Sequence, residues 1–157
     1  MTDYQNETIP VREAHRLDEK KLHAYLADHM EGISDDFALH QFAVGQSNPT
    51  YMVSTGDQRY VLRKKPPGTL LPSAHAVDRE YRIITALSPT PVPVPKTYLL
   101  CEDENVLGTA FYVMDMVPGR VLDDQFAPGF TPQERGAVYD NLLEILAAFH
   151  SVDYEAI

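Results

Sequence analysis

The chain has 157 residues, of which 44% are hydrophobic and 10% aromatic, so it can bury a core and is too apolar to be a disordered segment. Its formal net charge of −10 excludes broad binding to nucleic acid or to anionic membranes, because both are normally met by a surplus of Lys and Arg. The sequence has no N-terminal signal pattern and no apolar run long enough to cross a bilayer, and the single Cys101 cannot form an intrachain disulfide, so a reduced cytoplasmic setting is expected.

The N-terminal part of the sequence predicts an arm followed by a helix. Residues 1–17 show no clean period and are expected to be extended or poorly ordered. Asp18 is a suitable N-cap for a helix, with Leu17 and Leu22 placed as a hydrophobic staple. Gly32 is a fitting stop.

Three strand-like runs rich in β-branched and aromatic residues come next. They are FALHQFAVG from Phe37, TYMVST from Thr50 and RYVLRKK from Arg59. The short GDQ segment between the second and third runs predicts a β-hairpin. Ser73 is then expected to cap a helix that runs to about Leu87.

The segment SPTPVPVP, residues 88–95, predicts a stiff extended connector. Its prolines lack an amide hydrogen and have a fixed φ, so it can be neither a helix nor a central strand. Two further strand-like runs follow, KTYLLCE at 96–102 and TAFYVMDMV at 109–117. The apolar surroundings of Cys101 favour a small core residue over a nucleophile.

One acid lies on what should be the buried face of the second helix. Glu80 shares that face with the apolar residues Val77, Tyr81, Ile84 and Leu87. A buried carboxylate without a partner is costly, so a cation from the sheet is expected to meet it. Strand alternation sends Arg63 to one face and Lys64 to the other, and Arg63 is the stronger candidate for a bidentate pair. A purely structural ion pair fits this pattern as well.

The loop between the first two strands contains small residues with accessible amides. Gly45, Ser47 and Asn48 could approach a phosphate closely, although the same residues are ordinary in a plain hairpin turn. Their position before a basic strand and a helix with an inward Glu favours the phosphate interpretation.

The order of these features resembles the small lobe of a protein kinase. The stretches VGQSNPTYMV, YVLRKKPPG, SAHAVDREYRII, VPVPKTYLLCED and GTAFYVMDMVPGRVL resemble the aminoglycoside and choline phosphotransferase superfamily. They are most similar to the kinase-like proteins related to the domain fused to some acyl-CoA dehydrogenases. This resemblance, which begins at about Leu22, implies an α+β fold: a five-stranded antiparallel sheet with a Glu-bearing helix, plus the first helix of the C-terminal lobe.

The resemblance also implies a role for each site residue. The loop over the ATP phosphates would contain Gly45, Ser47 and Asn48. Arg63 stands where many kinases have a phosphate-contacting lysine, with Glu80 as its partner, and the departure from Lys leaves open whether Arg63 or Lys64 makes the contact. The adenine pocket would be formed by Met114 and by the backbone of Asp115 and Val117.

Two motifs of the family do not occur in this sequence. One is the His-Gly-Asp catalytic loop followed by Asn, and the other is the later Ile-Asp-Trp or Ile-Asp-Phe segment. The chain is therefore expected to be truncated, with an arm at 1–17, a small lobe at 18–117, and a connector and incomplete large lobe at 118–157. No metal site is expected within it, and the Mg ligands would belong to the missing part.

The last helix, over residues 132–150, is strongly predicted. Thr131, Pro132 and Glu134 provide an N-cap, a first-turn proline and a capping-box acid. Its apolar stripe consists of Val138, Leu142, Ile145, Leu146 and Phe149. This stripe would normally pack against absent helices, so self-association through it is expected.

The sequence thus predicts the ATP-binding lobe of a phosphotransferase that transfers the γ-phosphate of ATP to a hydroxyl group of a small metabolite. Resemblance to the dehydrogenase-associated group suggests a hydroxyacyl thioester as that metabolite. A non-catalytic nucleotide-binding or interaction module of the same fold is the alternative. An unrelated small α+β domain is a third possibility, and it would predict that Arg63 and Glu80 lie far apart.

Overall fold

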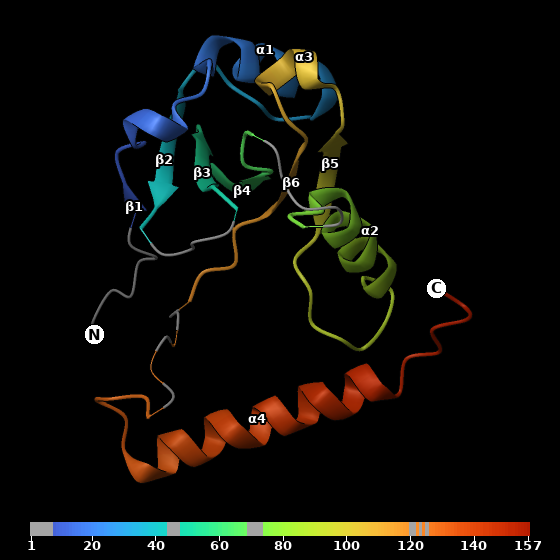
Figure 1. Ribbon diagram of the computed structural model, residues 1–157. Helices are drawn as coiled ribbons and strands as arrows, with labels where there is room; N and C mark the ends of the chain where they lie inside the picture. Colours follow the sequence, from blue (N-terminus) through green and yellow to red (C-terminus); the bar gives the residue numbers. More distant parts are fainter. Residues whose placement is uncertain (1–7, 44–47, 69–73, 120–121, 123, 125) are drawn as a thin grey trace.

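The computed structural model describes residues 8–43, 48–68, 74–119, 122, 124 and 126–157 (Figure 1). The elements in chain order are β1 (Thr8–Ile9), the 3-10 helix η1 (Glu13–His15), α1 (Glu19–His29), β2 (Phe37–Phe42), β3 (Thr50–Thr55), β4 (Gln58–Lys64), α2 (Val77–Leu87), β5 (Thr97–Cys101), α3 (Glu104–Leu107), β6 (Phe111–Asp115) and α4 (Pro132–His150). The predicted order of helices and strands is confirmed. The short elements β1, η1 and α3 were not predicted.

The strands form one antiparallel sheet of six strands in the order β1-β2-β3-β4-β6-β5. The predicted hairpin joins β3 to β4, and Thr55 faces Gln58 across a turn of two residues. Gly56 occupies that turn with a φ of +54°, a conformation that favours glycine. β1 extends the predicted five strands by pairing Thr8 with Phe42 in β2.

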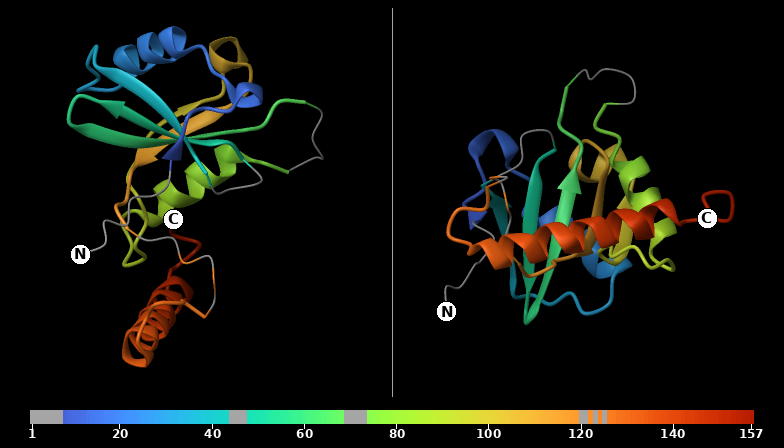
Figure 2. Two further views of the ribbon diagram at one scale, coloured as in Figure 1. Left: turned by 90° about the vertical axis from the view of Figure 1, so that its left-hand side faces the viewer. Right: turned by 90° about the horizontal axis from the view of Figure 1, so that it is seen from below.

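The main core lies between the sheet and α1 (Figure 2). Asp18 caps α1 as predicted, because its side chain accepts a hydrogen bond from the N–H of Lys21 at 3.0 Å. Leu22 and Leu26 are completely buried against the sheet. Cys101 is buried in the same cluster, in agreement with its predicted role as a small core residue.

The helix α2 covers the opposite face of the sheet, next to β5 and β6 (Figure 2). It begins at Val77, later than predicted, and its N-cap Ala76 makes no side-chain capping bond. The reason is His75, whose φ of +57° is incompatible with a right-handed helix. Ser73, the predicted cap, lies outside the described residues.

The helix α4 lies apart from the sheet and its two covering layers (Figures 1 and 2). Its predicted capping box is present, with Thr131 and Glu134 bonded to each other's backbone N–H. Leu142, Leu146 and Phe149 of the predicted stripe are exposed on it, whereas Val138 and Ile145 are partly buried. In the described part of the chain, no helix is long and apolar enough to cross a membrane.

Candidate functional site

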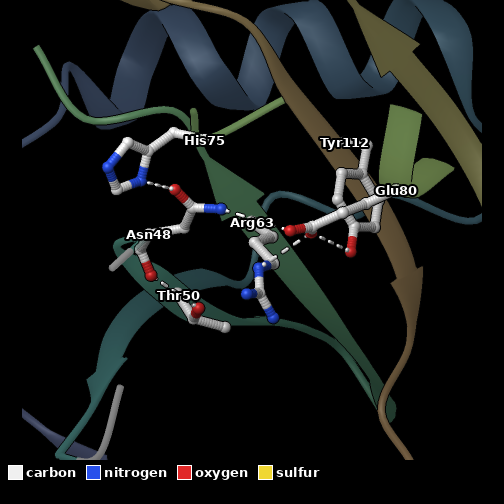
Figure 3. A network of polar contacts seen from close by, with 6 residues as sticks. All are labelled: Asn48, Thr50, Arg63, His75, Glu80 and Tyr112. Atoms are coloured by element: carbon white, nitrogen blue, oxygen red, sulfur yellow. Dashed lines mark hydrogen bonds and ion pairs between the residues drawn. The ribbon is translucent and has the colours of Figure 1, made fainter. Parts of the chain in front are cut away.

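Arg63 and Glu80 meet on the face of the sheet that α2 covers. Arg63 in β4 lies opposite Thr50 in β3 and Tyr112 in β6, so these three side chains share one face. The Arg63 Nε atom is 3.0 Å from Glu80 Oε2 (Figure 3). The two terminal nitrogens of Arg63 point away from Glu80 (Figure 3). The contact excludes an unrelated domain in which the two residues would be far apart.

The Arg63–Glu80 contact is an ion pair and not an aligned hydrogen bond. Although the two atoms are close, Arg63 Nε has no hydrogen-bond partner among the described residues. The side chains are 36% and 35% exposed, so Glu80 is less buried than the helical pattern predicted. Water therefore screens the pair, and it contributes less than a fully buried one would.

Glu80 accepts hydrogen bonds from two further elements (Figure 3). The hydroxyl of Tyr112 in β6 donates to Oε2 at 3.2 Å, and the amide of Asn48 donates to Oε1 at 3.4 Å. Burial, and then the charge of Glu80, raise the pKa of Tyr112 to about 12, so its hydroxyl remains a donor at neutral pH. Glu80 thus connects β4, β6 and Asn48, which lies two residues before β3.

Asn48 is held by His75 as well as by Glu80. His75 Nδ1 is 2.7 Å from Asn48 Oδ1, and the Asn48 side chain is buried (Figure 3). Asn48 was predicted to belong to a loop over the phosphates, and its side chain is bonded to His75 and Glu80 on the α2 side of the site. The other two predicted loop residues, Gly45 and Ser47, lie outside the described residues.

Lys64 lies on the opposite face of the sheet from Arg63, as the strand alternation predicted. It is buried, and its ammonium group donates to the hydroxyl of Thr109 and, at 3.5 Å, to the carbonyl of Lys65. Burial lowers the pKa of Lys64. The residues Asn48, Arg63, His75 and Tyr112 around Glu80 are called the Glu80 cluster below. The structure brings Arg63 into this cluster and keeps Lys64 away from it.

The predicted adenine residues lie at the end of β6 and beyond it. Met114 pairs with Val61, two residues before Arg63, so the Met114 side chain shares a sheet face with that of Arg63. The N–H of Asp115 donates to the Lys96 carbonyl at 2.8 Å, so this N–H is already engaged within the chain. Val117 is exposed just after the strand.

Sequence reasoning missed Tyr112 and His75. Tyr112 could have been found only from the β4–β6 register, which places it beside Arg63. Nothing in the sequence marks the left-handed conformation of His75. Among the described residues there is no group of three or more His, Cys, Asp or Glu side chains that could bind a metal ion.

A small antiparallel sheet whose inner strand presents an Arg to a Glu on the covering helix has the architecture of the small lobe of kinase-like proteins. The sequence profile of the phosphotransferase enzyme family matches residues 38–157. The chain therefore belongs to this family, and the resemblance seen in its motifs is confirmed.

The chain is also similar in sequence to proteins that are named as acyl-CoA dehydrogenase family members. Acyl-CoA dehydrogenase family member 11 of Rattus norvegicus is 44% identical over 159 residues, which cover 99% of this chain and 20% of that protein. Acyl-CoA dehydrogenase family member 10 of Mus musculus is 45% identical over 153 residues, which cover 95% of this chain and 14% of that protein. The chain thus spans a fifth or less of the length of these relatives.

A solved structure agrees with the fold. The crystal structure of a protein assigned as an aminoglycoside phosphotransferase, from Ralstonia eutropha JMP134, matches with a TM-score of 0.75 and 48% sequence identity. The match covers 90% of this chain and 40% of that one.

Proposed function

We propose that this chain is the ATP-binding lobe of a phosphotransferase that moves the γ-phosphate of ATP to a hydroxyl group of a small metabolite. The observation that carries the proposal is the Arg63–Glu80 ion pair at 3.0 Å. Glu80 holds the guanidinium through Nε, and the terminal nitrogens point away from it (Figure 3). An Arg held in this way can present two N–H groups to a phosphate.

We assign the phosphate contact to Arg63 and not to Lys64. The ammonium group of Lys64 is buried on the other sheet face and donates to Thr109, so it would have to leave these contacts to reach a ligand beside Glu80. Gly45 and Ser47 are proposed to provide backbone N–H groups to the same phosphates. Asn48 is proposed to anchor the end of their loop.

The adenine ring is proposed to lie against Met114 and Val61 on the same face. The carbonyl of Asp115 would accept a hydrogen bond from the exocyclic amine, since the Asp115 N–H already donates to Lys96. The N–H of Val117 would donate to a ring nitrogen. Two backbone contacts of this kind select adenine without requiring a charged side chain.

The bound ATP supplies the phosphoryl group, and Mg would neutralise the charge that develops during transfer. The described residues offer no group of three metal ligands, so the Mg ligands and the general base are proposed to lie outside this lobe. The contribution of this chain is to position the phosphates and to place a cation beside them.

The names of the relatives suggest the acceptor to test first. They are acyl-CoA dehydrogenase family members, so we propose a hydroxyl group on an acyl thioester as the acceptor. We also propose that the reaction takes place in the cytoplasm, where the free thiol of Cys101 would stay reduced.

Calorimetric titration of this chain with ATP, with and without magnesium, tests the proposed site. We expect ATP binding that Arg63→Ala and Glu80→Ala weaken about tenfold, because both remove the oriented cation. The matched control is Asp78→Ala. Asp78 lies on the same helix, but it pairs with Arg82 at 3.7 Å and not with Arg63. The absence of ATP binding, or an equal loss in the control, would refute the assignment.

Catalysis is tested separately in the whole protein that contains this chain. Formation of ADP that depends on an added hydroxyacyl thioester would support phosphotransfer. ATP binding without ADP formation from any hydroxyl acceptor would favour the non-catalytic binding module.

A further inference from the structure

His75 has a left-handed backbone conformation two residues before α2 begins. Its φ of +57° lies in the left-handed region, which is disfavoured for residues other than glycine. Its carbonyl accepts a hydrogen bond from the N–H of Val77 at 2.9 Å, at the point where α2 begins. A strained residue persists only where its surroundings hold it, and such residues concentrate at functional sites.

The donors and acceptors around Asn48 fix where each proton lies. The carboxylate of Glu80 can only accept, so Asn48 must turn its amide NH2 toward Glu80 Oε1, at 3.4 Å. Asn48 Oδ1 then faces His75 Nδ1 at 2.7 Å and can only accept. His75 must therefore carry a proton on Nδ1 and donate it to Asn48. If His75 did not donate there, the buried Asn48 Oδ1 would lose its donor, and only the longer bond to Glu80, at 3.4 Å, would hold the amide in place.

We propose that His75 is a positioning residue of the nucleotide site. By donating to Asn48 Oδ1, His75 holds the amide in the orientation that donates to Glu80, and Glu80 holds Arg63 at 3.0 Å. The same link ties Asn48, the first described residue after β2 and Ala43, to the beginning of α2 (Figure 3). This inference rests on the proposed ATP site, because ATP is the ligand for which Arg63 is positioned.

Two substitutions separate the side chain of His75 from its backbone. His75→Gly favours the positive φ and removes the donor, whereas His75→Asn tolerates a positive φ and retains an N–H donor near the position of Nδ1. We expect His75→Gly to weaken ATP binding about three- to tenfold, the effect of losing one orienting hydrogen bond, and His75→Asn to stay within about twofold.

Ala127→Gly is the matched control for backbone strain. Ala127 is the other described non-glycine residue with a positive φ, at 43°, and it does not belong to the Glu80 cluster. Its replacement should leave ATP binding unchanged. A His75→Gly variant that binds ATP as well as the wild type, or a His75→Asn variant that is as weak as His75→Gly, would overturn the proposal.

A second measurement separates this inference from the proposed function. In the chain without nucleotide, at about pH 8 where histidine rings are ordinarily neutral, nitrogen NMR should show the proton of His75 on Nδ1. Asn48→Ala should move that proton toward Nε2, and His75→Gly should shift the Arg63 Nε–H signal. Failure of the wild type to bind ATP would refute the ATP site alone. An unchanged Arg63 signal in His75→Gly would refute the positioning role alone.

Discussion

Removing Glu80 should destabilise the fold mainly through the hydrogen bond that Tyr112 loses. The ion pair with Arg63 joins side chains that are 36% and 35% exposed, and pairs so close to water contribute about 0.2–1 kcal/mol. The hydroxyl of the buried Tyr112 would lose its acceptor, which costs about 1–3 kcal/mol. The ion pair and the Tyr112 hydrogen bond together give a loss of about 1–4 kcal/mol in the free energy of unfolding of Glu80→Ala, and the lost acceptor of the buried Asn48 amide adds to it.

Glu80→Gln separates the two contributions. Gln retains one oxygen that can accept from Tyr112, but it has no charge for Arg63 and its NH2 would face the donor amide of Asn48, so the expected loss is about 1–2 kcal/mol. Urea unfolding followed by circular dichroism, with linear extrapolation to water, measures each difference. Asp78→Ala is the control on the same helix, and its exposed pair with Arg82 should account for about 0.5 kcal/mol or less.

A double mutant tests which contact dominates. In a Tyr112→Phe background the hydroxyl is already absent, so Glu80→Ala should cost about 1–3 kcal/mol less there and lose only the contacts with Arg63 and Asn48. If Glu80→Gln is as destabilising as Glu80→Ala, or if the Tyr112→Phe background changes nothing, the charge of Glu80 matters more than its hydrogen bond and the reasoning is wrong.

Three further predictions concern other parts of the chain. Lys64→Met should leave the ATP affinity measured by calorimetry within about twofold of the wild-type value. A tenfold loss would indicate that Lys64 contacts the phosphates. Leu142→Lys combined with Leu146→Lys should reduce self-association in sedimentation velocity, because both side chains are exposed on α4; an unchanged oligomer size would contradict this. Burial raises the pKa of Tyr51 from 10.0 to about 12, so its contribution to stability is present below pH 10 and is lost as the pH rises toward 12. The free energy of unfolding of Tyr51→Phe should therefore fall less with pH between pH 10 and 12 than that of the wild type, as measured by circular dichroism. An equal fall in the two proteins would contradict this prediction.

The strands, the long helices and the Arg63–Glu80 pair could be predicted because each depends on a local pattern. The β3–β4 hairpin follows from two β-rich runs around a glycine turn, and α4 follows from its capping box. Arg63 and Glu80 were matched because strand alternation and helical period each define a face. These periods repeat within a few residues, so no knowledge of the rest of the fold was needed.

The remaining contacts depend on distant parts of the chain. Tyr112 reaches Glu80 only because β6 pairs with β4 in a register that no local pattern defines. The late start of α2 follows from the left-handed backbone at His75, which the sequence predicted as helix. The helical period gave the direction of Glu80 correctly but not its exposure, since it contains no information on how much of that face the sheet covers.

The proline that follows β1 has a consequence for the edge of the sheet. An outermost strand presents unpaired N–H and C=O groups along its free side, and a long one can template the addition of a strand from another molecule. Within the described residues β1 consists of Thr8 and Ile9, and Pro10, which follows at once, has no N–H to offer. At Pro10 this edge of the sheet therefore cannot donate a hydrogen bond to a strand of another molecule, which limits how far such a strand could pair along it.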